Sequence, residues 1–401
     1  MQGPLHGIRV LDFTGVVAGP LATMCLADQG ADVIKVEPLR GDSARGSRQR
    51  IDKDGEFSAM FISCNRGKRS LAIDAKTPVG REVLLKLVAE VDVLVQNFRP
   101  GTMDRLGLGA EFLRREYPRL IYVSMDGVGE TGPYANKRVY DPIIQALSGF
   151  ADIQADPATG RPRMIRTIVA DKTTAIFAAQ AISAALFSRE RTGRGDHIRV
   201  AMLDTMISYL WPEGMMQYTV VGAEAITADP NLRPDLVFET RDGFITVGTI
   251  SDSEWSGFCH AVERPNLLLD DRFNTPAARS VNAVARIMLM GEVIKERSSA
   301  EWLGRFDAAD VPCAPILRRN EIIQNEQVVD RRLITELDQP TVGRVRQPRP
   351  AARFESADGR AIRPAPRIGE HTQDILVGLG YSDSQIANMA HDNAIKISSA
   401  L

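Results

Sequence analysis

Short runs of β-branched and other apolar residues alternate with longer stretches of helical periodicity over the first half of the chain. Such runs are typical of strands buried on both faces, whereas apolar residues that recur every three to four positions indicate amphipathic helices. Strands that alternate with helices predict right-handed βαβ units and a mostly parallel sheet. The expected strands are 8–13, 32–36, 70–73, 92–98, 119–124 and 197–202, and the expected helices are 19–27, one that starts at Thr77 and Pro78, one near Glu111, 171–190 and one through 206–209.

The pattern changes around Ala223. Residues 238–247 alternate around Asp242-Gly243, which predicts a β-hairpin, and helical periodicity then dominates to about Phe306, so a smaller second domain is expected. From Gln339 to Arg367 the chain is rich in Pro and Arg without a clear period. This stretch predicts an extended segment that lies on other structure, followed by a last helix at about 373–379.

Composition narrows the class of protein. The chain has 401 residues, 49 Lys and Arg against 51 Asp and Glu, and 44% hydrophobic residues, which excludes a disordered or collagen-like chain. The balanced charge argues against a surface built to hold nucleic acid or an anionic membrane. No apolar stretch is long enough to span a bilayer, and the N-terminus lacks the pattern of a signal peptide.

The four cysteines indicate in which cellular compartment the protein is expected. They lie far apart and form no CxxC pair, so they fit reduced core thiols better than a disulfide framework or a zinc site. We therefore expect a cytoplasmic protein that binds neither nucleic acid nor membrane.

Ligands of an open parallel sheet bind beyond the carboxyl ends of its strands. The loop after the first expected strand, 14–20, has two glycines four positions apart but lacks the third glycine of a dinucleotide fingerprint. Two interpretations remain open for this loop: a tight strand-to-helix turn, or a ligand that lies against bare backbone.

Basic residues collect after the second and third expected strands. Between Lys35 and Arg69 there are nine Lys and Arg residues against five Asp and Glu residues. Such an excess in loops is expected where phosphates bind, although a charge run can also be only a solvated face. Asn97 to Gly101 and Arg105 lie at the end of the fourth expected strand or just after it and should reach the same edge.

Few residues offer catalytic chemistry. The chain has neither a GxSxG nucleophile elbow nor an HExxH metal motif. Asp171 follows the apolar residues 168–170 and begins the Ala-rich helix, where backbone N–H groups stabilise negative charge. Asp171 is therefore either the N-cap of this helix or a carboxylate nucleophile that can form an acyl-enzyme.

A series of short segments extends over nearly the whole chain: Gly7–Asp12, Val17–Pro20, Gly30–Glu37, Asn65–Ser70, Asn97–Gly101, Thr131–Tyr134, Gln145–Gly149, Ala170–Asp171, Thr192–Gly195, Val311–Pro315 and Gly369–Thr372. Together they resemble the class III CoA-transferase family, which also contains α-methylacyl-CoA racemases. The resemblance implies an α/β subunit with a discontinuous Rossmann-like large domain, 1–222 and 325–401, and a small α+β domain with linkers, 223–324. It also implies an interlocked, ring-like homodimer, in which the Pro/Arg-rich tail returns from the small domain to the large one.

The resemblance assigns the catalytic aspartate to Asp171. Its carboxylate would attack the donor acyl-CoA to give a mixed anhydride, CoA thiolate would then form an aspartyl-CoA thioester, and an acceptor carboxylic acid would reverse these steps. No metal and no cofactor beyond the CoA substrate is implied. The resemblance places CoA along Val16, Ala18, Arg40, Leu71, Asn97, Phe98, Arg105 and Arg138, with Lys137 as a substitute for Arg138.

Position 140 separates the two branches of the family. Racemases have a His-Asp pair where this chain has Tyr140 and Asp141, and tyrosine is a poor base near neutral pH, so CoA transfer is favoured. Tyr140 and Asp141 either line the acyl site or serve only in packing and a turn.

The sequence says less about which carboxylic acids donate and accept CoA. Val17 and Thr249 to Asp252 depart from the formyl-CoA type of enzyme, which puts oxalate and formate in doubt as substrates. Arg166 is either an exposed arginine or the partner of the second carboxylate of a dicarboxylic acid, with succinyl-CoA as the favoured donor. The alternatives are an α-methylacyl-CoA epimerase that uses another base and a CoA-binding protein without turnover.

Overall fold

The computed structural model describes residues 3–46, 51–52, 55–222, 235–357 and 361–398. Contacts divide the chain into two compact units, each with its own hydrophobic core. The first unit comprises Met1–Gln154, Arg163–Met216 and Arg332–Leu401, and the second comprises Ala155–Pro162 and Gln217–Arg331.

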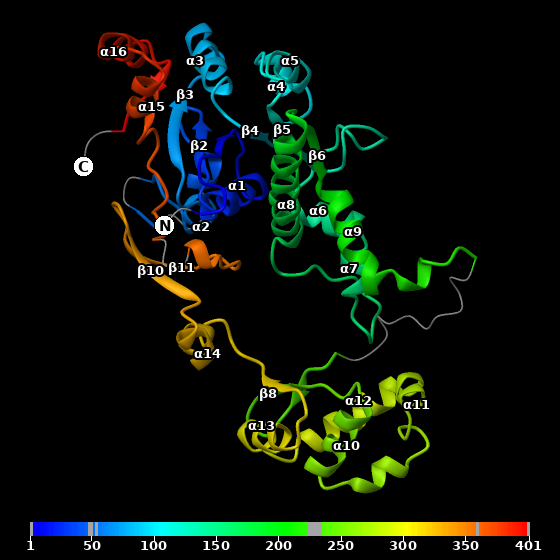
Figure 1. The fold of residues 1–401 in the computed structure, drawn as a ribbon. Helices are drawn as coiled ribbons and strands as arrows, with labels where there is room; N and C mark the ends of the chain where they lie inside the picture. Colours follow the sequence, from blue (N-terminus) through cyan, green and yellow to red (C-terminus); the bar gives the residue numbers. More distant parts are fainter. Residues whose placement is uncertain (1–2, 47–50, 53–54, 223–234, 358–360, 399–401) are drawn as a thin grey trace. The chain divides into compact units, whose positions relative to one another are not determined.

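A seven-stranded sheet organises the first unit (Figure 1). Its order is β12-β3-β2-β1-β4-β5-β6, and all neighbours are parallel except β12, which is antiparallel to β3. The six expected strands are confirmed, with ends that differ by one or two residues. The strands are β1 (Arg9–Asp12), β2 (Asp32–Glu37), β3 (Arg69–Ile73), β4 (Val93–Gln96), β5 (Ile121–Asp126), β6 (His197–Ala201) and β12 (Ile395–Lys396).

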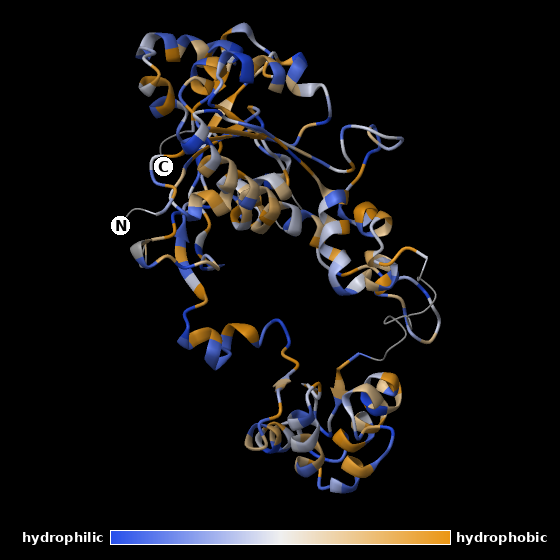
Figure 2. Cartoon of the chain, turned by 45° about the vertical axis from the view of Figure 1, so that its right-hand side comes forward, coloured by the Kyte–Doolittle hydropathy of each residue, from blue (hydrophilic) through white to orange (hydrophobic). Residues whose placement is uncertain are grey.

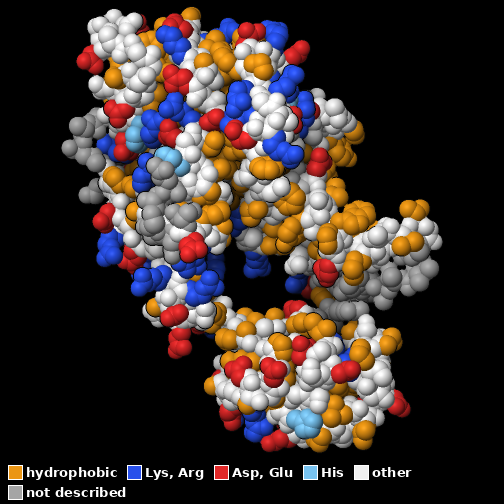
Figure 3. Space-filling view, in the orientation of Figure 1, with side chains coloured by type: hydrophobic (Ala, Val, Ile, Leu, Met, Phe, Trp, Pro, Cys, Tyr) orange, Lys and Arg blue, Asp and Glu red, His pale blue; other side chains and the backbone are white. Residues whose placement is uncertain are grey.

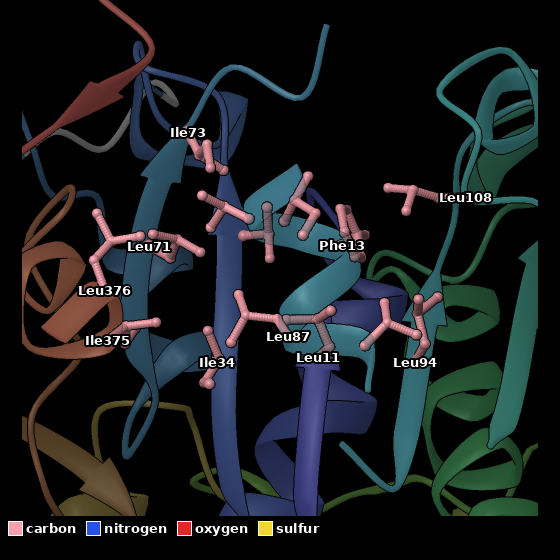
Figure 4. Packing of buried hydrophobic residues seen from close by; sticks show 14 of the residues in the cluster. Leu11, Phe13, Ile34, Leu71, Ile73, Leu87, Leu94, Leu108, Ile375 and Leu376 are labelled. Atoms are coloured by element: carbon pink, nitrogen blue, oxygen red, sulfur yellow. The ribbon is translucent and has the colours of Figure 1, made fainter. Parts of the chain in front are cut away.

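Helices cover both faces of this sheet. Successive side chains of a strand point to opposite faces; accordingly, Val10 packs with α1 and α8, whereas Leu11 packs in the cluster that contains α3 and α15. Figure 2 shows the central strands as predominantly hydrophobic, and Figure 4 shows Leu71 of β3 beside Leu376 of α15. The helices of this unit are α1 (Ala18–Asp28), α2 (Ala59–Asn65), α3 (Pro78–Val88), α4 (Thr102–Arg105), α5 (Ala110–Glu116), α6 (Asp141–Leu147), α7 (Phe150–Ile153), α8 (Val169–Thr192), α9 (Met202–Gly214), α15 (Thr372–Gly378) and α16 (Asp383–His391).

The start of α3 illustrates how local sequence determines an element. Thr77 is the N-cap, and its hydroxyl oxygen accepts a hydrogen bond from the Gly80 N–H at 3.0 Å. Pro78 follows in the first turn, where its missing N–H costs nothing because that donor has no partner within a helix. The predicted start at these two residues is confirmed.

The C-terminal part of the first unit differs from expectation. Residues 334–348 form an antiparallel hairpin of β10 (Ile334–Gln339) and β11 (Gly343–Pro348), whose alternation the Pro/Arg-rich composition conceals. The following segment is extended and anchored, since the Pro366 carbonyl accepts a bond from Arg45 and the Arg363 carbonyl accepts one from the Gly67 N–H. The helix expected as the last one is α15, but α16 and β12 follow it, so that prediction was wrong.

The second unit contains a small antiparallel sheet, β7-β8-β9, and a helical layer. The expected hairpin around Asp242-Gly243 is confirmed as the β7–β8 pair. Stacked aromatic rings form its core, with Trp255 on Phe258, Phe258 on Phe306 and Trp302 on Phe306 at centroid distances of 5.4 to 5.6 Å. The elements are β7 (Phe238–Glu239), β8 (Phe244–Val247), β9 (Cys313–Pro315), α10 (Asp252–Ala261), α11 (Pro276–Val281), α12 (Ala283–Ile294), α13 (Ser299–Ala308) and α14 (Glu326–Asp330).

All four cysteines are free thiols. Among the helices that the structure describes, none has the length and apolar character needed to cross a membrane.

Candidate active site

The large sheet reverses its winding direction between β1 and β4. The chain proceeds from β1 to β2 and β3 on one side and then crosses to β4, β5 and β6 on the other. Ligands of such sheets bind in the crevice outside the carboxyl ends of the strands at this switch point. The loops that follow β1 and β4 meet there, because the Asn97 side chain accepts a bond from the Gly15 N–H and donates one to the Gly15 carbonyl, both at 2.9 Å.

The loop after β1 has a strained backbone at Val16. Its φ of +71° lies in the left-handed region, where a β-branched residue is a rare outlier, at a cost of about 1–3 kcal/mol. The Val16 N–H donates to Asp42 Oδ1 at 3.2 Å. Asp42 is in turn paired with Lys35 at 2.9 Å, and both side chains are almost fully buried. A buried ion pair therefore anchors the strained loop that leads into α1.

Gly19, the second glycine of this loop, is explained by packing. A Cβ atom there would lie 2.3 Å from the Thr14 Cβ, so any side chain would collide with Thr14. At Gly15 the nearest atom would be Asp42 Oδ1 at 3.6 Å, which leaves room for a side chain. Close packing of helix on loop accounts for Gly19 without a ligand.

Asp171 is the third residue of α8, which begins at Val169. The N-cap is Ile168, whose side chain makes no capping bond, so the interpretation of Asp171 as the N-cap was wrong. Burial and the Asp141 carboxylate raise the pKa of Asp171 to about 6, although a backbone hydrogen bond from Ala18 opposes them. Asp171 is thus ionised at neutral pH and more basic than an ordinary carboxylate, which suits a nucleophile.

Asp141, the first residue of α6, is only 2% exposed. Its Oδ2 accepts the N–H groups of Ala170 at 2.7 Å and Asp171 at 3.3 Å, and its Oδ1 accepts Gln145 Nε2 at 2.6 Å. Of the two open interpretations, the structure therefore favours an internal role for Asp141. The cap of α8 comes from a side chain 29 positions away from Ala170.

Tyr140 and Arg166 are accessible. Tyr140 is 76% exposed at the N-cap position of α6, and Arg166 is exposed in the segment before α8. Gln145 binds the backbone on both sides of Arg166, through Ile165 and Thr167.

The residues expected along CoA fall into two groups. The Leu71 side chain is fully buried in the core, so it cannot contact a ligand, and Ala18 is nearly buried at the start of α1. The Asn97 side chain is already hydrogen-bonded to the Gly15 backbone through both its oxygen and its nitrogen. The residues whose side chains are open to solvent are Val16, Arg40, Phe98, Arg105, Lys137 and Arg138.

Of the six basic residues of 35–69 that the structure describes, Lys35, Arg45, Arg66 and Lys68 are buried in ion pairs, so their interpretation as a phosphate footprint was wrong. Three of the acidic partners, Asp12, Asp28 and Asp32, precede this window, so the charge count within it leaves them out. Arg48, Arg50 and Lys53 lie outside the described residues. The ion pairs are Lys35–Asp42, Arg45–Glu37, Arg66–Asp28, Lys68–Asp12 and Arg69–Asp32.

Two residues of the site were not singled out from the sequence. Gln145 lies four positions after Asp141, the spacing at which helical side chains meet, so this pair was open to prediction. Asp42 gave no such signal, because its contacts with Val16 and Lys35 depend on the loop conformation.

Residues 5–372 match the family model described as CoA-transferase family III. The chain belongs to CoA-transferase family III. The relative named succinyl-CoA:glutarate CoA-transferase from Mus musculus is 34% identical over 93% of this chain and 86% of the relative. The formyl-CoA:oxalate CoA-transferase of Escherichia coli is 33% identical over 98% of this chain and 100% of the relative.

The fold agrees with this membership. A solved structure described as a CaiB/BaiF family protein from Brucella suis has a TM-score of 0.80 and 33% identity over 94% of this chain and 100% of that chain. This family III chain is therefore an enzyme, a CoA-transferase, and the resemblance stated from its motifs is confirmed.

Proposed function

We propose that Asp171 is the nucleophile with which this CoA-transferase moves CoA from a donor acyl-CoA to a carboxylic acid. The observation that carries the proposal is the position of Asp171 in the first turn of α8, beside the start of α1, with a pKa raised to about 6. A carboxylate nucleophile divides one difficult transfer into two easier ones.

The proposed steps balance without a metal or a redox cofactor. An Asp171 oxygen attacks the thioester carbonyl carbon, the C–S bond breaks, and a mixed anhydride and CoA thiolate result. The thiolate attacks the Asp171 carbonyl carbon and releases the donor acid, which leaves an aspartyl-CoA thioester. An acceptor carboxylate then attacks this thioester, which releases CoA thiolate and forms a second mixed anhydride. The thiolate attacks the acceptor's carbonyl carbon of this anhydride, which gives the new acyl-CoA and restores the Asp171 carboxylate.

The accessible basic residues support a binding path for CoA at the carboxyl edge of the sheet. Arg40, Arg105, Lys137 and Arg138 are exposed on loops or short helices that follow β2, β4 and β5, and guanidinium and ammonium groups bind phosphates through charge-assisted bonds. Phe98 is 39% exposed and offers an apolar surface to the adenine. Ala18, the first residue of α1, donates a backbone hydrogen bond to the Asp171 carboxylate, which brings the start of α1 beside the nucleophile.

We propose succinyl-CoA and dicarboxylic acids as the substrates. The mouse relative is named for succinyl-CoA and glutarate, and both acids carry a second carboxylate. Arg166 lies five positions before Asp171 on a segment that Gln145 holds at two points, so its guanidinium is suited to bind that second carboxylate.

We also propose an interlocked homodimer in the cytoplasm. Large apolar side chains are exposed on α8 and α9, and Figure 3 shows hydrophobic side chains gathered over these helices. Contiguous exposed apolar surface is typical of a protein interface. The exposed residues are Ile176, Phe177, Phe187, Ile207, Tyr209 and Trp211.

One experiment tests the reaction and the nucleophile together. The enzyme is incubated with succinyl-CoA and a panel of mono- and dicarboxylic acids, and the new CoA thioesters are identified by mass spectrometry. In parallel, hydroxylamine is added to the enzyme with succinyl-CoA, and the peptides are mapped. We expect transfer to dicarboxylates and a hydroxamate at Asp171, because hydroxylamine attacks both the anhydride and the thioester.

Other results would support the competing functions. Exchange of an α-proton in deuterated water, with CoA retained on its acyl group, would favour an epimerase. Tight CoA binding without any exchange would favour a binding protein. An unmodified Asp171 in an active transferase would remove it as the nucleophile.

Substitution of Arg166 by glutamine should affect dicarboxylates selectively. A hydrogen bond to a charged group contributes about 1.5–3 kcal/mol, so the KM for a dicarboxylic acceptor should rise by about tenfold or more, while that for a monocarboxylic acceptor stays unchanged. The measurement is the acceptor KM at saturating donor. Arg191→Gln, at the far end of α8, is the matched control, and equal effects on both acceptor classes would contradict the assignment.

A further inference from the structure

The first turn of α8 lacks a capping side chain of its own. The N-cap residue, Ile168, is apolar, and a helix begins with four N–H groups that have no partner within the helix. The Val169 N–H donates to the Thr167 carbonyl at 2.8 Å, and the first regular bond of the helix runs from the Lys172 N–H to the Ile168 carbonyl at 3.2 Å. The two N–H groups between them, those of Ala170 and Asp171, depend on a side chain from another helix.

That side chain is Asp141 of α6. Its Oδ2 accepts both N–H groups, at 2.7 Å from Ala170 and 3.3 Å from Asp171. The carboxylate is 2% exposed, so these bonds are not in competition with bulk water. One buried group thus holds the backbone of the residue whose side chain is the proposed nucleophile.

Gln145, one turn further along α6, extends this hold to the preceding segment. Its Nε2 donates to Asp141 Oδ1 at 2.6 Å and lies 3.3 Å from the carbonyl oxygens of Ile165 and Thr167. Its Oε1 accepts the Ile165 N–H at 2.9 Å. Asp141 and Gln145 together form a clamp that runs from residue 165 to residue 171.

We propose that Asp141 is a positioning residue for the transfer reaction, which with Gln145 sets the place and the charge environment of the Asp171 carboxylate without contacting the acyl group. The inference rests on the proposed function of Asp171. It assigns to Asp141 a role that is neither a base nor an acyl contact.

The clamp also changes the pKa of Asp171, because it places a second carboxylate beside it. Burial and then the Asp141 carboxylate raise the pKa of Asp171, whereas the Ala18 N–H of α1 lowers it. Cys64 of α2 also lies within electrostatic range, but burial raises the pKa of its thiol, so it is neutral near pH 7. Asp141 is therefore the charged group that keeps the nucleophile more basic than an ordinary aspartate.

The test is the pH dependence of kcat/KM for Asp141→Asn. Asparagine retains an oxygen that can accept the two N–H groups but removes the negative charge. The wild-type rate should fall below about pH 6, because a protonated carboxyl cannot attack. In the variant, this fall in kcat/KM at acid pH, the acid limb, should move to lower pH by about half a unit or more, which is a threefold change in proton affinity. The kcat/KM reached at higher pH should also decrease, because a less basic carboxylate is a weaker nucleophile.

Thr77→Ala provides the matched control. It removes a helix cap in the same unit, at α3, and should lower the melting temperature without moving the acid limb. An Asp141→Asn enzyme with a wild-type acid limb, or a control whose limb moves equally, would overturn the proposal.

A second variant separates geometry from charge. Gln145→Leu removes the bonds to Asp141, Ile165 and Thr167 but leaves the Asp141 charge in place. We expect its kcat to fall by about tenfold with an unchanged acid limb, since a small displacement of the nucleophile is costly. An unchanged kcat would contradict the positioning role. Hydroxylamine mapping of the wild-type enzyme distinguishes failure of this inference from failure of the proposed function, because it reports on Asp171 alone.

Discussion

Replacement of Asp171 by asparagine should abolish CoA transfer and stabilise the folded chain at the same time. The amide cannot form the anhydride, so kcat should fall by roughly a thousandfold or more. The folded-state pKa of about 6 exceeds the ordinary value of 3.8, so ionised Asp171 opposes folding at neutral pH. Since one pKa unit corresponds to about 1.4 kcal/mol and the side chain is partly exposed, the expected gain is about 1–3 kcal/mol at pH 7.5.

The pH dependence of this gain is the stricter measurement. The stability that protonation of Asp171 provides is complete below the unfolded-state pKa and is lost as the pH rises through about 6. Urea denaturation should therefore show a gain for the variant at pH 7.5 that declines between pH 6 and 4. Asp152→Asn, an exposed carboxylate on α7, should change neither activity nor stability. An Asp171→Asn protein that is less stable than the wild type at pH 7.5 would contradict the conclusion that burial and the Asp141 carboxylate disfavour the ionised form of Asp171.

Substitution of Lys68 by methionine should have the largest effect on stability. Its Nζ donates to Asp12 Oδ2 at 2.9 Å, to the Pro20 carbonyl at 2.9 Å and to Asn65 Oδ1 at 2.8 Å, and both charged groups are completely buried. Burial raises the pKa of Asp12, but Lys68 and Lys35 outweigh it and bring that pKa below its ordinary value. Loss of the ammonium leaves a buried carboxylate without its closest counter-charge, which typically costs about 3–5 kcal/mol.

Two comparisons make this prediction specific. Lys86→Met removes an exposed pair with Glu82, and water screens such a pair, so its effect on stability should be far smaller. Adding Asp12→Asn to Lys68→Met removes the orphaned charge and should recover part of the loss. A stable Lys68→Met protein with weakened CoA binding would instead restore the phosphate-binding interpretation of this lysine.

The strands of the large sheet could be predicted because each is a continuous apolar run. Val10 and Leu11 are buried on opposite faces, and such burial leaves a clear pattern in the sequence. The strand β12 has only two residues, and the β10–β11 hairpin is rich in arginine and proline, so neither carries that pattern.

The candidate site was predictable in its position but not in its polar contacts. The ends of β1 and β4 follow from the sheet topology, and Asp171 follows from its place near the start of an Ala-rich helix. That Asp141 caps α8 does not, because the cap depends on how α6 packs against α8 and not on residues near the helix start. The same holds for the pairs Lys35–Asp42 and Lys68–Asp12, because no pattern in the sequence indicates which carboxylate each lysine contacts.

The antiparallel strand β12 has a consequence for synthesis of the chain. It completes the sheet beside β3, and the nearby bond from the Ala72 N–H to Thr372 Oγ1 joins residues 300 positions apart. Ribosomes add about 5–20 residues per second, so β3 waits on the order of tens of seconds for its neighbour. During that interval its unpaired N–H and C=O groups form an open sheet edge, which is a template for aggregation. We therefore expect the chain to be prone to aggregation during synthesis until Ile395 and Lys396 have emerged.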